Sequence, residues 1–190
     1  MLIAILDADV LFPMMLRDTL LRAAAAGCFR VHWSARILDE VTRNLIQDHG
    51  MAPSKATALR EIMEEAFPDA MVDGWEPIEQ GMPNHPKDRH VVAAAVVIGA
   101  TAIVTSNIRD FAVLPPGIIT MRPDEFLCEL LGTKPRELLE ALDAQVTAYQ
   151  RPRLNIQELL ERMHAIAPRF VRQAQRVAAS RTGSAATRQG

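Results

Sequence analysis

An unbroken apolar run from Leu2 to Leu6 opens the chain and stops abruptly at Asp7. A short run of aliphatic and β-branched residues predicts a strand buried on both faces, as a central strand of a parallel sheet is. Open parallel sheets bind their ligands just beyond the carboxyl ends of their strands. Asp7 would lie at that position, so it is the first candidate for chemistry.

The rest of the chain alternates between strand-like and helix-like segments. Further strands are predicted at 29–33, 70–72, 101–107 and 118–121, and helices at 14–26, 34–49, 53–67, 88–98 and 123–131. Proline and glycine are frequent between residues 73 and 87, which predicts a long surface loop. This alternation predicts an α/β domain with a mostly parallel sheet.

Beyond Thr133 the pattern is helical only. Asn155 followed by Glu158 is typical of a capping box, and Pro168 is typical of the first turn of a helix. We therefore expect three parts, namely a domain over 1–132, a helical extension over 133–180, and a disordered tail over 181–190, where the sequence is small and polar.

The composition suits one core with an appendage. The chain has 190 residues, and none of its apolar runs approaches the roughly 20 residues that span a bilayer. Acids occur at Asp7 and Asp9, before any signal-like stretch could form. We therefore expect a cytoplasmic protein without membrane contact. Cys28 and Cys128 lack metal-type spacing and are interpreted as core residues.

The net charge of −2 hides two halves of opposite sign. Residues 151–190 contain eight arginines and two acids, which gives 8 − 2 = +6, whereas residues 1–150 contain 13 basic and 21 acidic residues, which gives −8. A basic segment can contact phosphates. It can equally pack against the acidic half or lie in solvent, and these alternatives stay open from the sequence.

Four acids are candidates for one site. Asp7 follows a predicted strand, and Asp110 lies shortly after another. Glu40 and Asp88 belong to helices whose first turns are expected to face the same edge of the sheet as these strand ends. Glu40 lies on the flank of its helix's apolar stripe, whereas Asp39 points away from it. Asp88 could instead act only as a helix cap, because a carboxylate is favoured at a helix start.

Clustered carboxylates need a cation or protons. Two ionised carboxylates about 4 Å apart repel by roughly 4 kcal/mol at an effective dielectric constant of 20. Oxygen ligands of this kind suit Mg²⁺ or Mn²⁺, which can activate water for hydrolysis of a phosphodiester bond. The sequence contains no glycine-rich phosphate loop, no Ser/His/Asp triad and no CxxC pair.

Four motifs also resemble a known family. LDADVL, SARILDEV, KDRHVVAAA and TSNIRDF, in this order over residues 1–130, are similar to motifs of the PIN-domain ribonucleases, many of which are toxins of bacterial VapBC-type toxin–antitoxin pairs. The resemblance implies a three-layer α/β/α sandwich and Mg²⁺- or Mn²⁺-dependent endonucleolytic cleavage of RNA. It also implies a cognate antitoxin as partner and, since dimers are common in the family, a homodimer.

By the same resemblance, the metal-binding and catalytic acids are Asp7, Glu40, Asp88 and Asp110, with Thr105 and Asn107 as supporting polar residues. Asp9 departs from the Asn or Ser that is frequent at its position, so it either adds charge to the site or points elsewhere. The helices after Thr133 resemble the extension of a longer-chain subgroup.

Two other functions compete with this interpretation. LDADVLF also fits the first motif of haloacid dehalogenase-like phosphatases, with Asp7 as nucleophile and Asp9 as acid/base, and IVTSN fits the second. That class needs a later lysine and a pair of late acids, and after Ser106 the chain offers only Lys134 and no such pair. The other alternative is a catalytically silent RNA-binding PIN module.

Overall fold

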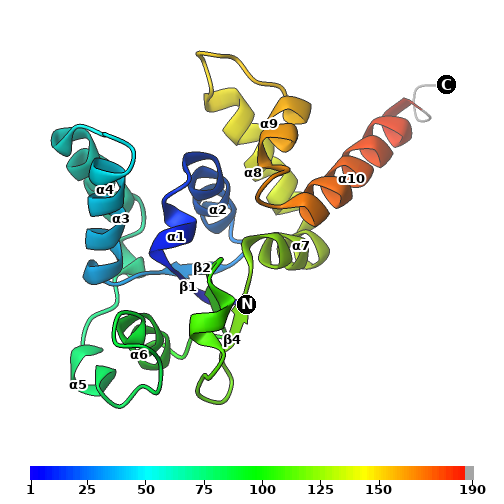
Figure 1. The fold of residues 1–190 in the computed structure, drawn as a ribbon. Helices are drawn as coiled ribbons and strands as arrows, with labels where there is room; N and C mark the ends of the chain where they lie inside the picture. The colour runs from blue at the N-terminus through cyan, green and yellow to red at the C-terminus, as the bar shows by residue number, and fades with distance from the viewer. Residues whose placement is uncertain (187–190) are drawn as a thin grey trace. The chain divides into compact units, whose positions relative to one another are not determined.

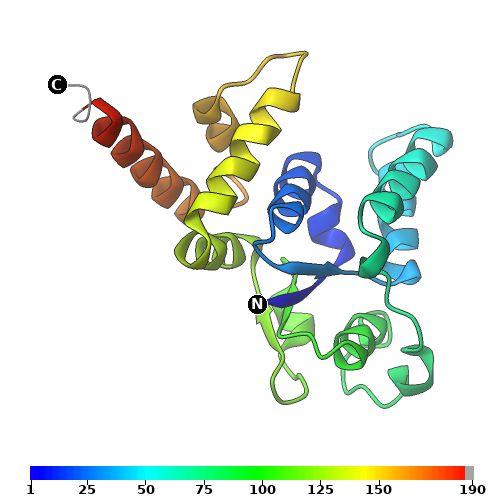
Figure 2. The same ribbon diagram turned by 180° about the vertical axis from the view of Figure 1, so that it is seen from behind.

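The computed structural model describes the backbone of residues 1–186 and the side chains of residues 1–178. The chain divides into two compact units. Unit 1 comprises Met1–Arg17 and Phe29–Arg122, and unit 2 comprises Asp18–Cys28 and the chain from Pro123 onward. Figures 1 and 2 show the same ribbon from opposite sides.

Unit 1 is built on a parallel sheet. Its described strands are β1 (Ile3–Leu6), β2 (Arg30–His32), β3 (Ala102–Val104) and β4 (Ile119–Met121), arranged in the order β2-β1-β3-β4 with every pairing parallel. The central strands β1 and β3 are almost wholly buried, which explains their unbroken apolar sequences. The predicted α/β class and parallel sheet are confirmed.

Helices lie on both faces of this sheet. The helical segments before the last strand are α1 (Ala8–Leu11), α2 (Met14–Ala25), α3 (Ala35–Gln47), α4 (Pro53–Ala66), η1 (Pro68–Ala70), α5 (Glu76–Glu79), α6 (Arg89–Val97) and η2 (Ile108–Phe111). The chain steps from β1 to β2 in one direction and from β2 to β3 in the other. A right-handed crossover into β3 puts α6 on the face opposite α1, whereas α3 packs against α1. Helix α6 packs on β1 and β3, and α1 lies on the other face (Figure 1).

Local sequence explains the helices that border the site. The Ser34 hydroxyl accepts a hydrogen bond from the Ile37 N–H at 3.3 Å and so caps α3. The predicted stripe of α3 is its buried face, formed by Ile37, Leu38, Val41 and Leu45. Helix α6 is buried along most of its length and is followed by Gly99, whose φ of 61° is the left-handed conformation that favours glycine after a helix.

The segment between α4 and α6 differs from expectation. The strand predicted at 70–72 is reduced to one parallel bridge between Met71 and Trp33, because η1 occupies the residues just before it. The predicted loop over 73–87 contains the short helix α5, and Trp75 in this stretch is buried. Proline and glycine thus mark the irregular path, but they do not reveal that this path packs inward.

Unit 2 is helical. It contains most of α2 together with α7 (Pro123–Thr133), α8 (Pro135–Ala148), α9 (Ile156–Met163) and α10 (Pro168–Ala186). The Thr19 hydroxyl in α2 donates a buried hydrogen bond to Gln145 Oε1 at 2.8 Å. Asp124 Oδ1 accepts from the Phe170 N–H at 2.8 Å and so holds the first turn of α10.

The predicted helices after Thr133 are present, and Asn155 and Glu158 form the predicted capping box. The predicted division into 1–132 and 133–180 stays a prediction. Of the expected disordered tail, residues 187–190 lie outside the described residues, and α10 extends to Ala186. No helix in the described part of the chain is both long and apolar enough to cross a membrane.

His32 couples the stability of the sheet to pH. Its side chain is buried in β2, and burial first and the nearby Arg30 second lower its pKa. At a pH above about 6.5, the pKa of histidine in an unfolded chain, His32 is neutral in both the folded and the unfolded state. At a lower pH, His32 binds a proton more readily in the unfolded state. His32 therefore makes the free energy of unfolding fall as the pH drops below about 6.5.

We predict that His32→Gln flattens this dependence. Urea unfolding followed from about pH 7 to about pH 5 should show a smaller loss of unfolding free energy in the variant than in the wild type. The control is His164→Gln, which changes an exposed histidine of unit 2. Equal slopes in the wild type and in His32→Gln would contradict the prediction.

Candidate active site

Asp7 is fixed at the carboxyl edge of the two central strands. Its backbone N–H donates to the Val104 carbonyl at 3.1 Å, which continues the pairing of β1 with β3. Its Oδ1 accepts from the Ala8 N–H at 2.7 Å, and its Oδ2 accepts from the Thr105 hydroxyl at 2.9 Å. Because Thr105 directly follows β3, the parallel register alone brings these two side chains together.

The environment of Asp7 opposes its ionisation. Burial raises the pKa of this carboxyl to about 7, the neighbouring charge of Asp9 adds to the increase, and Glu40 contributes in the same direction. The hydrogen bonds from Thr105 and Ala8 favour the charged form but do not compensate. In the absence of a bound cation, this environment therefore favours the protonated form of Asp7 far more than water does.

Asp9 is close to Asp7 but is held by a different group. Its Oδ2 accepts from the Ser106 backbone N–H at 2.7 Å, and its Oδ1 is buried without a hydrogen-bond partner among the described residues. Burial raises the pKa of Asp9. Asp9 therefore adds charge near the site, and its Oδ2 binds the backbone of the loop that follows β3.

Asp110 lies on η2, the turn that follows β3, and two side chains contact one oxygen of its carboxylate. Its Oδ2 accepts from the Asn107 side-chain amide and forms an ion pair with Lys87 Nζ at 2.9 Å. Lys87 first and Asn107 second lower the pKa of Asp110. Asn107 also donates its backbone N–H to the Thr105 hydroxyl at 3.1 Å, so Thr105 and Asn107 connect Asp7 with Asp110.

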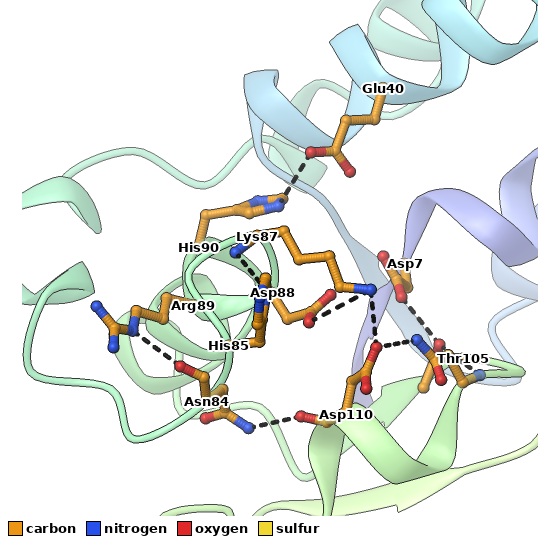
Figure 3. A network of polar contacts seen from close by, with 11 residues as sticks. Asp7, Glu40, Asn84, His85, Lys87, Asp88, Arg89, His90, Thr105 and Asp110 are labelled. Atoms are coloured by element: carbon orange, nitrogen blue, oxygen red, sulfur yellow. Dashed lines mark hydrogen bonds and ion pairs between the residues drawn. The ribbon is translucent and has the colours of Figure 1, made fainter.

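Asp88 immediately precedes α6, but it does not cap this helix. No hydrogen bond joins its side chain to the first turn, so the capping alternative is wrong. Its Oδ2 is buried, has no hydrogen-bond partner among residues 1–178, and lies 3.9 Å from Lys87 Nζ (Figure 3). Burial raises the pKa of Asp88, whereas the charge of Lys87 lowers it. A buried carboxylate oxygen without a donor needs a cation nearby.

Glu40 faces the same region from α3, whereas its neighbour Asp39 is exposed, as the helical spacing predicts. Glu40 Oε1 lies 3.3 Å from His90 Nε2 and 3.9 Å from Arg36 Nε. His90 is wholly buried on α6, two residues after Asp88, and its ring lies 5.9 Å from that of Trp75. His90 is thus a packing residue that faces Glu40.

The structure brings Asp7, Asp9 and Asp110 into a network with Thr105, and it brings Asp88 to the same network through Lys87. Glu40 acts on Asp7 only through its charge. Within residues 1–178, no group of three or more histidine, cysteine or acidic side chains is already arranged to hold a metal ion. The donor chemistry nevertheless fits Mg²⁺ or Mn²⁺, because the donors are carboxylates and an ammonium already lies among them.

Sequence reasoning missed two residues of this network. Lys87 was assigned to the surface loop, and Asn84 was not singled out. Asn84 Nδ2 donates to the backbone carbonyls of Asp110 and Val113 at 2.9 and 3.1 Å, and the backbone carbonyl of Asn84 accepts from Arg89 Nε at 2.9 Å. The only sequence signal was a polar stretch, NHPKDRH, placed directly before a buried helix.

Comparison with known proteins agrees with this geometry. Residues 4–109 match a family model described as PIN domain, and residues 123–176 match one described as VapC50 C-terminal domain. The "Putative ribonuclease VapC50" of Mycobacterium tuberculosis (strain ATCC 25618 / H37Rv) is 34% identical over 111 residues, which are 57% of this chain and 66% of the relative. The match thus spans just under two thirds of the length of this relative.

No solved structure matches the chain. The PIN-domain match covers more than half of the 190 residues and includes Asp7, Glu40 and Asp88, while Asp110 follows its last residue directly. The second match begins where unit 2 takes up the chain again after Arg122. The chain therefore belongs to the PIN-domain family, and it carries a helical C-terminal part of the VapC50 type.

Proposed function

We propose that this protein is a metal-dependent endoribonuclease that hydrolyses RNA phosphodiester bonds. The observation that carries the proposal is the gathering of Asp7, Asp88 and Asp110 at the carboxyl edge of the sheet, around the positive charge of Lys87. A cation is thus already held where a divalent ion would bind. RNA is the proposed substrate because the relative named above is described as a ribonuclease.

The same relationship supports a biological role. We propose that the chain is the toxin of a toxin–antitoxin pair, that it acts in the cytoplasm, and that a cognate antitoxin protein restrains it. A second copy of the chain is a further proposed partner. The VapC50-type match of residues 123–176 supports this assignment, because it extends the relationship beyond the catalytic unit.

Asp7, Asp88 and Asp110 would hold Mg²⁺ or Mn²⁺, and Glu40 would complete the acidic set. When bound, the ion would lower the pKa of a water molecule and stabilise the leaving oxygen of the phosphodiester. Thr105 orients Asp7 through its 2.9 Å hydrogen bond, and Asn107 orients Asp110. Outer residues of this kind keep the ligands in one geometry.

The phosphatase alternative is set aside because the chain belongs to the PIN family. It would also require Asp9 to act as an acid/base, whereas Asp9 Oδ2 holds the Ser106 N–H. The alternative of a silent RNA-binding module is separated from the nuclease by the following experiment.

We predict that Asp7→Asn and Asp88→Asn each lower RNA cleavage in Mn²⁺ by at least about 100-fold, because outer-shell changes alone cost up to about that factor. Cleavage of a mixed RNA pool measures the effect. The matched control is Asp39→Asn, an exposed acid of α3 that pairs with Arg60 outside the site. It should cleave like the wild type. Wild-type protein that binds RNA and leaves it intact would instead support the silent module.

Unit 2 offers a surface for the RNA backbone. Arg169, Arg172 and Arg176 follow helical spacing along α10 and are exposed, opposite a buried face that includes Phe170 and Ala174. The sequence of α10 contains no acid. None of the ion pairs between described residues involves these three arginines, which leaves their guanidinium groups able to pair with phosphates.

We predict that replacing all three arginines by glutamine weakens binding of single-stranded RNA and makes it less sensitive to salt. Each phosphate contact contributes about 0.7 to the slope of log affinity against log salt concentration for a single strand. Loss of three contacts should therefore reduce the magnitude of this slope by about 2. Fluorescence anisotropy in the Asp7→Asn background measures binding without cleavage.

The control for this experiment removes three exposed positive charges from unit 1, in Arg30→Gln, Arg43→Gln and Lys55→Gln. It has the same change in net charge and should retain most of the salt dependence. Equal slopes in the two triple variants would show that net charge, and not the α10 surface, determines binding.

A further inference from the structure

The ammonium of Lys87 takes the place of a cation within the carboxylate cluster. Lys87 Nζ lies 2.9 Å from Asp110 Oδ2 and 3.9 Å from Asp88 Oδ2, the buried oxygen that has no hydrogen-bond donor (Figure 3). The hydrogen bond to Asp110 contributes most to the raised pKa of Lys87, and the charges of Asp88 and Asp7 also contribute. Three of the proposed metal-binding acids therefore act on this one group.

The backbone that carries Lys87 is held in place, but its side chain is free to leave. Three residues before Lys87, the Asn84 side chain donates to the backbone carbonyls of Asp110 and Val113, and the buried helix α6 begins two residues after Lys87. The Lys87 side chain, by contrast, is 60% exposed. A long flexible stem with one end in solvent can swing its ammonium out of the cluster without any change in the fold.

We propose that Lys87 is a built-in counterion of the carboxylates, which it neutralises until a divalent ion displaces it. This inference rests on the proposed metal-dependent function and adds a control of metal loading. In the metal-free protein the ammonium lowers the repulsion between Asp88 and Asp110. In the loaded protein it has moved out to solvent, because the divalent ion repels a second cation at so short a distance.

This role has two opposite consequences for a variant without the charge. Without Lys87 the metal-free cluster keeps its full repulsion, so the metal-free protein becomes less stable. The incoming ion, however, no longer competes with an ammonium, so it binds more tightly. A lysine with a merely structural role would weaken both properties when replaced, and an inert surface lysine would change neither.

The test compares the wild type with Lys87→Gln, using MnCl₂ as the probe. We expect Lys87→Gln to bind Mn²⁺ about three- to tenfold more tightly in isothermal titration calorimetry, a modest factor because the exposed ammonium is screened by water. In the metal-free state its melting temperature should be about 2 °C or more below that of the wild type. Lys55→Gln removes the same charge from an exposed position on α4 and should change neither property.

The outcomes separate this inference from the proposed function. Unchanged or weaker Mn²⁺ binding in Lys87→Gln overturns the counterion role, even if the wild type cleaves RNA. Tighter Mn²⁺ binding together with a lower melting temperature supports it, even if no RNA is cleaved. If neither protein binds Mn²⁺, both the counterion role and the metal-dependent function are overturned.

Discussion

The structure depends on keeping a desolvated carboxylate, that of Asp7, at the centre of the parallel sheet. Asp7 cannot move away from the sheet, because its own N–H continues the ladder between β1 and β3. Burial removes much of the hydration of this side chain, so the protein must supply other groups that stabilise the charge. Thr105 and the Ala8 N–H supply part of this stabilisation, but burial and the charge of Asp9 still raise the pKa of this carboxyl above its usual range. The polar groups around Asp7 act by stabilising its negative charge.

Helices α3 and α6 are connected at the site by Glu40 and His90. The 3.3 Å contact between these side chains joins α3 to the first turn of α6, which follows Asp88 directly. Because His90 is wholly buried, it cannot rotate away without opening the core. The position of the Glu40 side chain is thus set by its contact with the buried His90 as well as by its place on α3. This explains how an acid from a more distant helix is kept pointed at the sheet.

Much of the fold could be predicted because it follows from local patterns. The run from Leu2 to Leu6 predicted the central strand, and the spacing of Ile37, Leu38, Val41 and Leu45 predicted the buried face of α3. These patterns work because burial on one or two faces leaves a periodic trace in the sequence. The same reasoning placed Asp7 at a strand end and turned Glu40, not Asp39, toward the site.

The details of the site could not be predicted in this way. Asn84 and Lys87 act through side-chain contacts with residues more than 20 positions away, and such contacts leave no periodic trace. Asp88 illustrates an ambiguity that the sequence left open, since a carboxylate before a helix resembles a cap and yet this one makes no cap hydrogen bond. Only the folded chain distinguishes an acid that serves the backbone from one that is kept unpaired.

The split of unit 2 between two distant stretches of sequence affects how the protein is made. Residues 18–28 leave the ribosome long before α8, so Thr19 and the apolar side chains around it wait for Gln145 and its neighbours to be synthesised. During that interval an amphipathic helix is present without its covering layer, a state that favours aggregation or chaperone binding. Unit 2 can therefore complete its core only after α8 has been synthesised, more than 100 residues after α2.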